Sequence, residues 1–180
     1  MERVRTLAAG GPLQDVAEAL LSAWQAVNGQ VSTLSRRLIV MARQDRAVKR
    51  LRTAPGVGVL AALTYVGVVD DPQRLAKSSS VGAYVGLTPR RFQSGEDDCS
   101  GHISKHGDVL LRTYLFEAAG IILHRVAKRS TLKAWGARLA KRIGAKKAAV
   151  AAARKLAGIL HRMRTDDSEF RGSAQDAQTA

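Results

Sequence analysis

Apolar residues recur every seven positions over the first fifty residues of the chain. One set is spaced by seven and a second set falls four residues later: Leu13, Leu20, Val27, Leu34, Met41 and Val48, with Ala17, Trp24, Val31 and Leu38. This is the a/d pattern of a coiled coil, although Asn28-Gly29 weakens it because glycine costs about 1 kcal/mol inside a helix. We therefore expect a self-associating helix over residues 13–52 after a flexible stretch over 1–12. The alternative is one long helix packed on its own domain.

The pattern over residues 53–164 predicts a compact helical domain. A cap residue precedes several of its apolar, helically spaced segments. Ser78–Ser80 can cap a short helix that turns Val81, Tyr84 and Val85 inward, and Ser130 can cap the helix that begins at residue 131. Asp108 can cap a helix whose buried face is formed by Leu111, Tyr114, Leu115, Ala118, Ile121 and Ile122. The expected helices cover residues 59–69, 81–85, 109–126, 131–143 and 145–163. Residues 165–180 are polar and acidic, and we expect them to be disordered.

Between residues 87 and 107 the helical spacing stops. This stretch is rich in glycine and polar residues and is long for a loop in a compact domain, which is typical of a functional or disordered segment. A small hairpin is the alternative. The chain as a whole is predicted to be all-α, with a coiled coil, a helical domain and one long polar loop.

The Pro-Gly-Val-Gly run at 55–58 resembles a helix-hairpin-helix turn. Gly56 and Gly58 would let the backbone turn tightly, so that the following helix presents free N–H groups to a phosphate. A plain corner between two helices uses the same residues, so the run alone leaves both interpretations open.

Charge points to a polyanionic partner. The chain has 29 Lys and Arg against 15 Asp and Glu, a formal net charge of +14, and residues 118–164 hold thirteen of these cations and no acid. Nucleic acid is the favoured partner and an acidic membrane surface the second choice. Two basic pairs on the last helix, Lys146-Lys147 and Arg154-Lys155, lie about two turns apart and roughly on one side.

Composition also bounds the compartment. Cys99 is the single cysteine, which excludes an internal disulfide and fits a reducing environment. The N-terminus lacks the pattern of a signal peptide, and the apolar runs are far shorter than the roughly 20 residues that span a bilayer. We expect a cytoplasmic protein with no membrane partner.

Ser94 is the candidate for chemistry, because it lies beside a glycine in the polar loop with several cations nearby. Arg90, Arg91, Lys105 and Arg112 are close enough in sequence to converge on a phosphate and stabilise the charge that develops when a hydroxyl attacks it. The alternative is a serine that only forms a turn.

No metal site or cofactor is expected in this chain. Cys99-x-x-His102-x-x-x-His106 offers three ligands where a structural zinc needs four, and Glu96–Asp98 places three acids on one loop, which is more typical of solvated acids than of a magnesium site. Trp24 and Trp135 are interpreted as seam and core residues rather than as base-stacking platforms, and the small number of aromatic residues argues against recognition of a single strand by stacking.

Several ordered motifs resemble the C-terminal transposase domain of the DEDD insertion-sequence transposases (the "IS one-ten" family). The resemblance covers roughly residues 13–164. It is carried by Leu51-Arg52-Thr53-Ala54-Pro55-Gly56-Val57-Gly58, Ala83-Tyr84-Val85-Gly86-Leu87-Thr88-Pro89-Arg90, Ser94-Gly95, Gly101-His102-Ile103-Ser104-Lys105-His106-Gly107-Asp108, Leu111-Arg112, Lys146-Lys147-Ala148 and Ala153-Arg154-Lys155-Leu156.

The resemblance implies one part of a two-part recombinase. In that family a RuvC-like nuclease domain binds Mg²⁺ through four acids, a coiled coil follows, and a loop serine in the C-terminal domain becomes linked to a DNA phosphate. An element-encoded bridge RNA chooses the DNA sites. Carried over, Ser94 would be the nucleophile, DNA and a guide RNA the partners, and Mg²⁺ would belong to a RuvC-like domain that we expect this chain to lack.

Two positions depart from the family pattern. Asp108 stands where the family more often has Asn, and the acids at 96–98 lie close to the expected cleavage site. Because the RuvC-like part and its Mg²⁺ site are expected to be absent, we expect the chain to bind nucleic acid, with strand cleavage requiring the rest of the enzyme. The competing hypothesis is a non-catalytic nucleic-acid-binding and oligomerisation module, or a transposase remnant.

Overall fold

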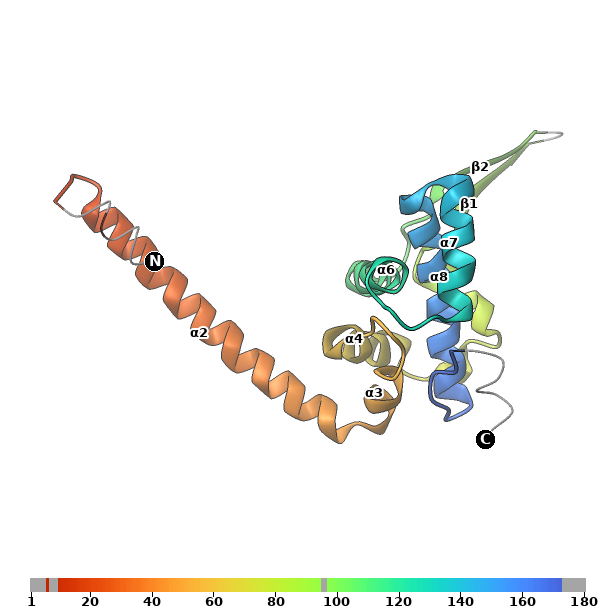
Figure 1. Cartoon of the computed structure of the whole chain (residues 1–180), viewed down its shortest axis with the longest axis horizontal. Helices are drawn as coiled ribbons and strands as arrows, with labels where there is room; N and C mark the ends of the chain where they lie inside the picture. Colours follow the sequence, from red (N-terminus) through yellow and green to blue (C-terminus); the bar gives the residue numbers. More distant parts are fainter. Residues whose placement is uncertain (1–5, 7–9, 95–96, 173–180) are drawn as a thin grey trace. The chain divides into compact units, whose positions relative to one another are not determined.

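The computed structural model describes Thr6, residues 10–94 and residues 97–172. The chain forms two compact units, Met1–Met41 and Ala42–Ala180. Helix α2 (Gln14–Gln44) makes up most of the described first unit and continues into the second (Figure 1).

The long helix is confirmed, but it ends earlier than its heptads predict. Asp45 has extended backbone (φ −81°, ψ 119°), and its carboxylate accepts a 3.1 Å hydrogen bond from the Val48 N–H, which starts a separate helix α3 (Arg46–Leu51). Val48, the last heptad position, is fully buried in the core of the second unit. Leu13, Leu20, Val27, Leu34 and Met41 are exposed in this single chain, and self-association through them stays a prediction.

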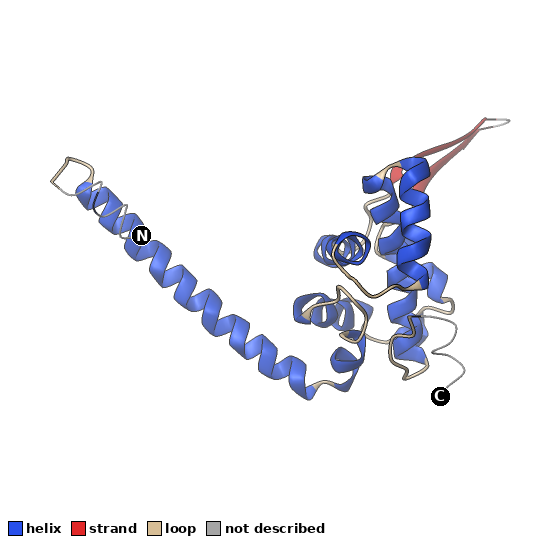
Figure 2. Ribbon diagram, viewed as in Figure 1, coloured by secondary structure: helices blue, strands red, loops and turns tan. Residues whose placement is uncertain are grey.

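The second unit is mostly helical, as predicted (Figure 2). Its further elements are α4 (Val59–Val69), the 3₁₀ turns η1 (Pro72–Arg74) and η2 (Ser78–Ser80), α5 (Val81–Tyr84), strands β1 (Pro89–Ser94) and β2 (Asp97–Ile103), and helices α6 (Val109–His124), α7 (Thr131–Ile143) and α8 (Ala145–Thr165). Asp108 and Ser130 are the N-caps of α6 and α7, as expected. The long polar loop folds as an antiparallel hairpin, which is the alternative that the sequence leaves open.

Helix α8 is the centre of this unit. It packs against α6 and α7 and also contacts α3 and α5. Small residues on its buried face, Ala148, Ala152, Ala153 and Ala157, allow these helices to approach closely. The hydroxyl of buried Tyr65 on α4 donates a 2.8 Å hydrogen bond to the Ala157 carbonyl, which fixes α4 to the same helix.

Two residues expected in the core are exposed. Tyr84 is 46% exposed, and its hydroxyl donates to the Val68 carbonyl at the surface. Ile121 lies roughly a quarter turn around α6 from the buried stripe that contains Leu115 and Ile122, so it faces outward.

The segment after α8 is packed as far as residue 172, although the sequence predicts disorder from residue 165. The Phe170 N–H donates to Thr53 Oγ1 at 2.9 Å, and the Thr131 N–H donates to the Gly172 carbonyl at 2.9 Å. Phe170 also packs partly buried against the core, which offsets the entropy of ordering this segment. The remainder of the predicted tail lies outside the described residues.

Two stretches of backbone cross closely at the base of the hairpin. A Cβ at Gly86 would lie 2.0 Å from the His106 carbonyl oxygen, and a Cβ at Gly107 would lie 2.1 Å from the Tyr84 carbonyl oxygen. Both glycines have positive φ, 71° and 81°. Glycine is therefore required at both positions, for space and for backbone conformation.

We predict that Gly86→Ala and Gly107→Ala each lower the free energy of unfolding by about 3 kcal/mol or more, from left-handed strain together with overpacking. The matched control is Gly120→Ala on α6, where a Cβ meets no atom within 4 Å, and which should leave stability unchanged or raise it by up to about 1 kcal/mol. Urea unfolding followed by circular dichroism measures all three. Similar stability of the Gly86→Ala protein and the control would contradict the crossing.

The buried hydroxyl of Tyr65 leads us to predict that the folded protein loses stability at alkaline pH. Burial raises the pKa of its hydroxyl well above the ordinary value of 10.0, and the positive charge of Arg164 offsets only part of that effect. Above about pH 10 the unfolded chain loses this proton while the folded chain keeps it, so the free energy of unfolding falls with rising pH.

Tyr65→Phe isolates this contribution. The variant should be less stable than wild type by about 1 kcal/mol below pH 10, since it lacks the hydrogen bond to Ala157. The stability difference should then shrink as pH rises from 10 to 11.5, as measured by urea unfolding. Parallel pH profiles for the two proteins would contradict the assignment.

Candidate nucleic-acid groove

The hairpin carries Ser94 away from the helices. Strand β1 pairs antiparallel with β2 from Pro89 opposite Ile103 to Ser94 opposite Asp97. Its base is fixed to the crossing, because the Ser104 N–H donates to the Thr88 carbonyl at 2.8 Å. The two strands project beyond the helices of the unit (Figure 1).

Ser94 is exposed at the end of β1. It borders a small hollow with Arg91, Phe92, Gln93 and Cys99. Side chains alternate along a strand, so Ser94 shares a face of β1 with Phe92 and Arg90. Gly95 and Glu96, which the sequence interpretation also considers, lie outside the described residues.

A groove of about 1510 Å³ runs along the exposed side of α8. Strands β1 and β2, turn η2, helix α7 and the segment after α8 form its walls. The cations that line it are Arg90, Lys105, Lys147, Arg154, Lys155, Arg162 and Arg171.

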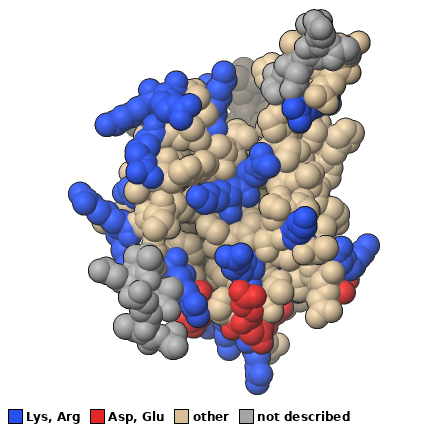
Figure 3. Space-filling model, turned by 90° about the vertical axis from the view of Figure 1, so that its right-hand side faces the viewer, with Lys and Arg blue, Asp and Glu red and all other residues tan. Residues whose placement is uncertain are grey.

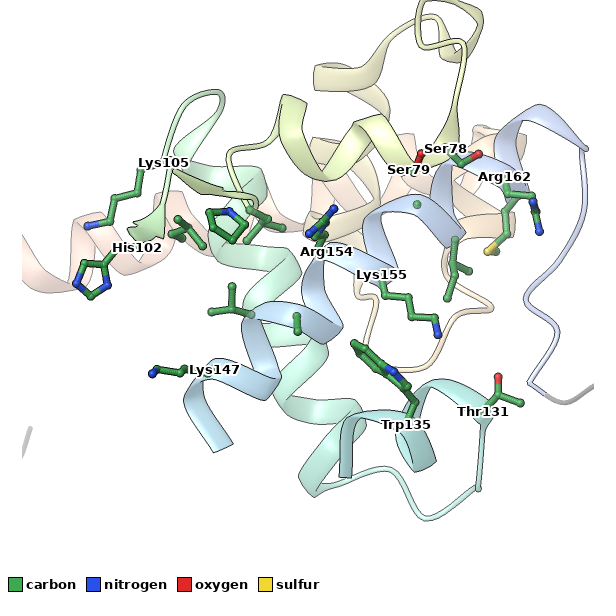
Figure 4. A pocket seen from close by; sticks show the side chains of 18 of the residues that line it. Ser78, Ser79, His102, Lys105, Thr131, Trp135, Lys147, Arg154, Lys155 and Arg162 are labelled. Carbon is green, nitrogen blue, oxygen red and sulfur yellow. The ribbon is translucent and has the colours of Figure 1, made fainter. Parts of the chain in front are cut away.

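Four of these cations follow one face of α8. Lys147, Arg154, Lys155 and Arg162 are separated by seven, one and seven residues, which keeps them on one side of a helix with 3.6 residues per turn. From Lys147 to Arg162 the helix rises about 22 Å at about 1.5 Å per residue. Figure 4 shows Arg154, Lys155 and Arg162 along α8, with Lys105 and His102 of the hairpin side near the Lys147 end.

Packing holds two of these side chains in place. The stem of Arg154 lies against Gly82 of α5, where a Cβ would be 2.6 Å from its Cγ. The Lys155 ammonium lies 4.6 Å from the centroid of the Trp135 ring, a cation–π contact between α8 and α7. Both contacts restrain long side chains that would otherwise lose more conformational entropy on binding.

A buried histidine supports the wall that contains Ser78. His161 on α8 is almost fully buried, its Nε2 is 2.8 Å from the Pro72 carbonyl oxygen, and its Nδ1 is 2.9 Å from Ser78 Oγ. A carbonyl can only accept, so Nε2 carries a proton and donates to Pro72, while Nδ1 and the Ser78 hydroxyl form the second hydrogen bond. His161 thus fixes both 3₁₀ turns to α8.

The floor of the groove is apolar. It includes Leu87, Ile103, Val150, Ile159 and Trp135. Asp166 and Glu169 line the groove in the segment that follows α8, beyond Arg162. Figure 3 shows one face of the molecule on which Lys and Arg border an uncharged area and the acids gather toward its lower edge.

Five of the predicted phosphate contacts meet in this groove: Arg90, Lys105, Lys147, Arg154 and Lys155. The other predicted residues lie elsewhere. Lys146 is exposed but does not line the groove, and Arg91 borders the hollow beside Ser94.

Arg112 and Gly56 make contacts that the sequence does not anticipate, whereas Gly58 precedes the next helix as expected. Arg112 Nη1 donates to the Val85 and His106 carbonyls at 3.2 Å each, so it holds the backbone crossing. A Cβ at Gly56 (φ 80°) would lie 2.6 Å from the Ala118 carbonyl oxygen, so this glycine serves the packing of the 53–58 turn on α6. Gly58 is exposed and is the N-cap of α4.

Sequence reasoning misses Arg162, Ser78, Ser79 and the position of Trp135 at the groove. Arg162 could have been found, because it extends the spacing of Lys147 and Arg154 by two more turns. Trp135 packs partly buried against the core, as interpreted from the sequence, but it also lines the groove. The serines carry no sequence signal that separates them from ordinary turn residues.

Within residues 10–94 and 97–172, no three His, Cys, Asp or Glu side chains come together as they would to hold a metal ion. In the same part of the chain, no helix is both long and apolar enough to cross a membrane.

Comparison with known proteins gives a family for part of the chain. Residues 48–135 match the family described as Transposase IS116/IS110/IS902 family. The chain is 34% identical over 138 residues to the transposase for insertion sequence element IS1111A of Coxiella burnetii. The aligned residues make up 76% of this chain and 38% of that protein. It is also 30% identical over 142 residues to the transposase for insertion sequence element IS1328 of Yersinia enterocolitica. Here the aligned residues make up 78% of this chain and 42% of that protein.

The chain therefore contains a transposase domain of the IS116/IS110/IS902 family, and the resemblance seen in the sequence is confirmed at that level. It spans less than half the length of the curated relatives that it matches.

Proposed function

We propose that this chain is the DNA-handling part of an insertion-sequence transposase, in which the groove along α8 holds nucleic acid and Ser94 attacks a phosphodiester. The observation that carries the proposal is the position of Ser94. It lies at the end of the β1 face that also bears Arg90 and Phe92, and both of those residues line the groove. A strand held in the groove and continued along this face would reach the serine.

The groove supplies binding through charge. Its seven cations face two acids, Asp166 and Glu169, at one end. Phosphates bound there would release condensed counterions, which favours association at low salt. Arg154 and Lys155 are restrained by Gly82 and Trp135, so less entropy is lost on binding.

The proposed chemistry is a reversible transesterification. The Ser94 Oγ–P bond forms as one P–O ester bond breaks, the hydroxyl proton is removed, and the leaving oxygen gains a proton. The phosphoserine conserves the ester energy for rejoining. Arg91 borders the same hollow as Ser94 from the other face of β1, and its long side chain would bring positive charge to the developing phosphorane.

Other parts of the enzyme enter the proposal through the family alone. A RuvC-like domain with Mg²⁺, a guide RNA and a second copy of the chain paired through the α2 seam would complete the reaction. The exposed heptad residues of α2, Leu20 and Leu34 among them, are compatible with that pairing.

The second candidate function is that of a non-catalytic module that binds nucleic acid and oligomerises. It is favoured by one observation, that the groove and the apolar seam of α2 are formed by residues other than Ser94. The two functions share binding and differ in covalent chemistry.

Covalent trapping separates them. We expect the chain, supplied with a RuvC-like partner domain, guide RNA, Mg²⁺ and nicked DNA duplexes, to form a protein–DNA adduct on a denaturing gel. Ser94→Ala should abolish the adduct and leave DNA affinity within about 2-fold, since one exposed hydroxyl contributes little to binding. The matched control is Gln93→Ala, the adjacent exposed residue on the other face of β1, which should retain the adduct.

An undiminished adduct in the Ser94→Ala protein would contradict the serine mechanism. Salt-sensitive binding with no adduct in the wild-type protein would favour the binding module.

Substitutions at two neighbouring lysines test whether DNA binds in the groove. Lys147→Ala should weaken binding to duplex DNA and reduce the slope of log affinity against log salt by about 0.9, the effect of one lost phosphate contact. Lys146→Ala is the control, because this exposed lysine precedes Lys147 and does not line the groove. Fluorescence anisotropy at 50–300 mM salt measures both slopes, and equal effects of the two variants would place the contacts outside the groove.

A further inference from the structure

The floor of the groove is unlike a surface for phosphates alone. Ile103, Val150 and Ile159 line it between the cations, all three partly buried and packed against the core. A phosphate brought against such a floor would lose water without gaining hydrogen bonds there. The floor instead suits flat apolar groups of a ligand whose charges lie at the rim.

Phe92 supplies a second apolar element. It is 60% exposed, lines the groove and lies against Gly101, where a Cβ would be 3.1 Å from the ring. One part of the ring is thus covered by the hairpin and the rest is open to the groove. An exposed aromatic ring beside bound phosphates is the arrangement on which an unpaired base stacks.

The two forms of nucleic acid differ in what they offer this surface. A duplex presents phosphates and sugars on its outside and keeps the faces of its bases stacked inside. A single strand presents apolar base faces and phosphates together. Only the single strand complements an apolar floor with a basic rim.

The span of the cations along α8 sets the length of nucleic acid that the groove can hold. The cations from Lys147 to Arg162 span about 22 Å, which matches about six nucleotides at a stacked spacing of about 3.4 Å. Beyond Arg162, Asp166 and Glu169 would repel further phosphates. The strand would therefore run from the hairpin end toward Arg162 and turn away there.

We propose that the groove along α8 binds a single-stranded segment of nucleic acid, with its bases against the apolar floor and Phe92 and its phosphates toward the cations of the rim. This inference rests on the proposed nucleic-acid binding and goes beyond it, because it names the form that is bound and the way it lies. DNA and RNA share this chemistry.

The test uses the whole chain and three labelled 12-nucleotide probes of one mixed sequence: single-stranded DNA, the same sequence as single-stranded RNA, and the DNA duplex. Fluorescence anisotropy at 150 mM salt should show at least one single strand binding about 10-fold more tightly than the duplex. The DNA and RNA probes distinguish the two sources of the strand.

Phe92→Ala makes the test specific. It should weaken single-strand binding at least about 5-fold, the loss expected for one stacked base, and leave the salt slope unchanged because no phosphate contact is removed. Leu110→Ala is the control, since Leu110 is also an exposed large apolar residue and lies on α6 outside the groove. Lys147→Ala should instead reduce the slope, by about 0.7 for a single strand.

The outcomes separate this inference from the proposed function. Equal or tighter duplex binding, or no effect of Phe92→Ala, would overturn the single-strand inference while nucleic-acid binding stands. No salt-dependent binding of any probe would overturn both and would point to an acidic protein surface as the ligand of the groove.

Discussion

The close crossing of two backbone segments at the base of the hairpin is the constraint on which the site depends. Gly86 and Gly107 each occupy a place where a Cβ would lie about 2 Å from a carbonyl oxygen of the other segment, and both need positive φ. Arg112 adds two hydrogen bonds to carbonyls on either side of the crossing. One end of the hairpin is thereby joined to the start of α6, which packs on α8. The strands that carry Arg90, Phe92 and Ser94 therefore leave the helical body from a fixed base beside the groove.

Helix α8 contributes to the core and to the groove at once, because its two faces differ in composition. Its alanines let α6 and α7 approach on one side, while arginines and lysines at intervals of seven and eight residues occupy the other. Tyr65 and His161 each place a hydrogen bond between this helix and a distant segment. Changes in packing on the alanine face would shift the cations on the other face, so core stability and groove geometry are coupled.

Periodicity and capping predicted the helices well, because Asp108, Ser130 and the apolar stripes act locally. They placed the end of the first helix too late. Val48 continues the heptad of α2, but the cap formed by Asp45 turns it into the core of the next unit, and a repeat of seven cannot distinguish those environments. Only some of the residues that line the groove could be predicted from the sequence. Lys147, Arg154 and Lys155 follow from helical spacing, whereas the contributions of Ser78, Trp135 and the hairpin depend on contacts between segments far apart in the sequence.

The motifs that signal the family have an explanation that is largely one of backbone geometry. Gly86, Gly107 and Arg112 form the crossing, and Gly56 lets the 53–58 turn pack on Ala118. None of these residues needs to touch a ligand to be required. Ser94 differs from them, since it is exposed at the end of β1. A serine exposed at the end of a strand whose base the fold fixes through several glycines is compatible with the proposed nucleophile.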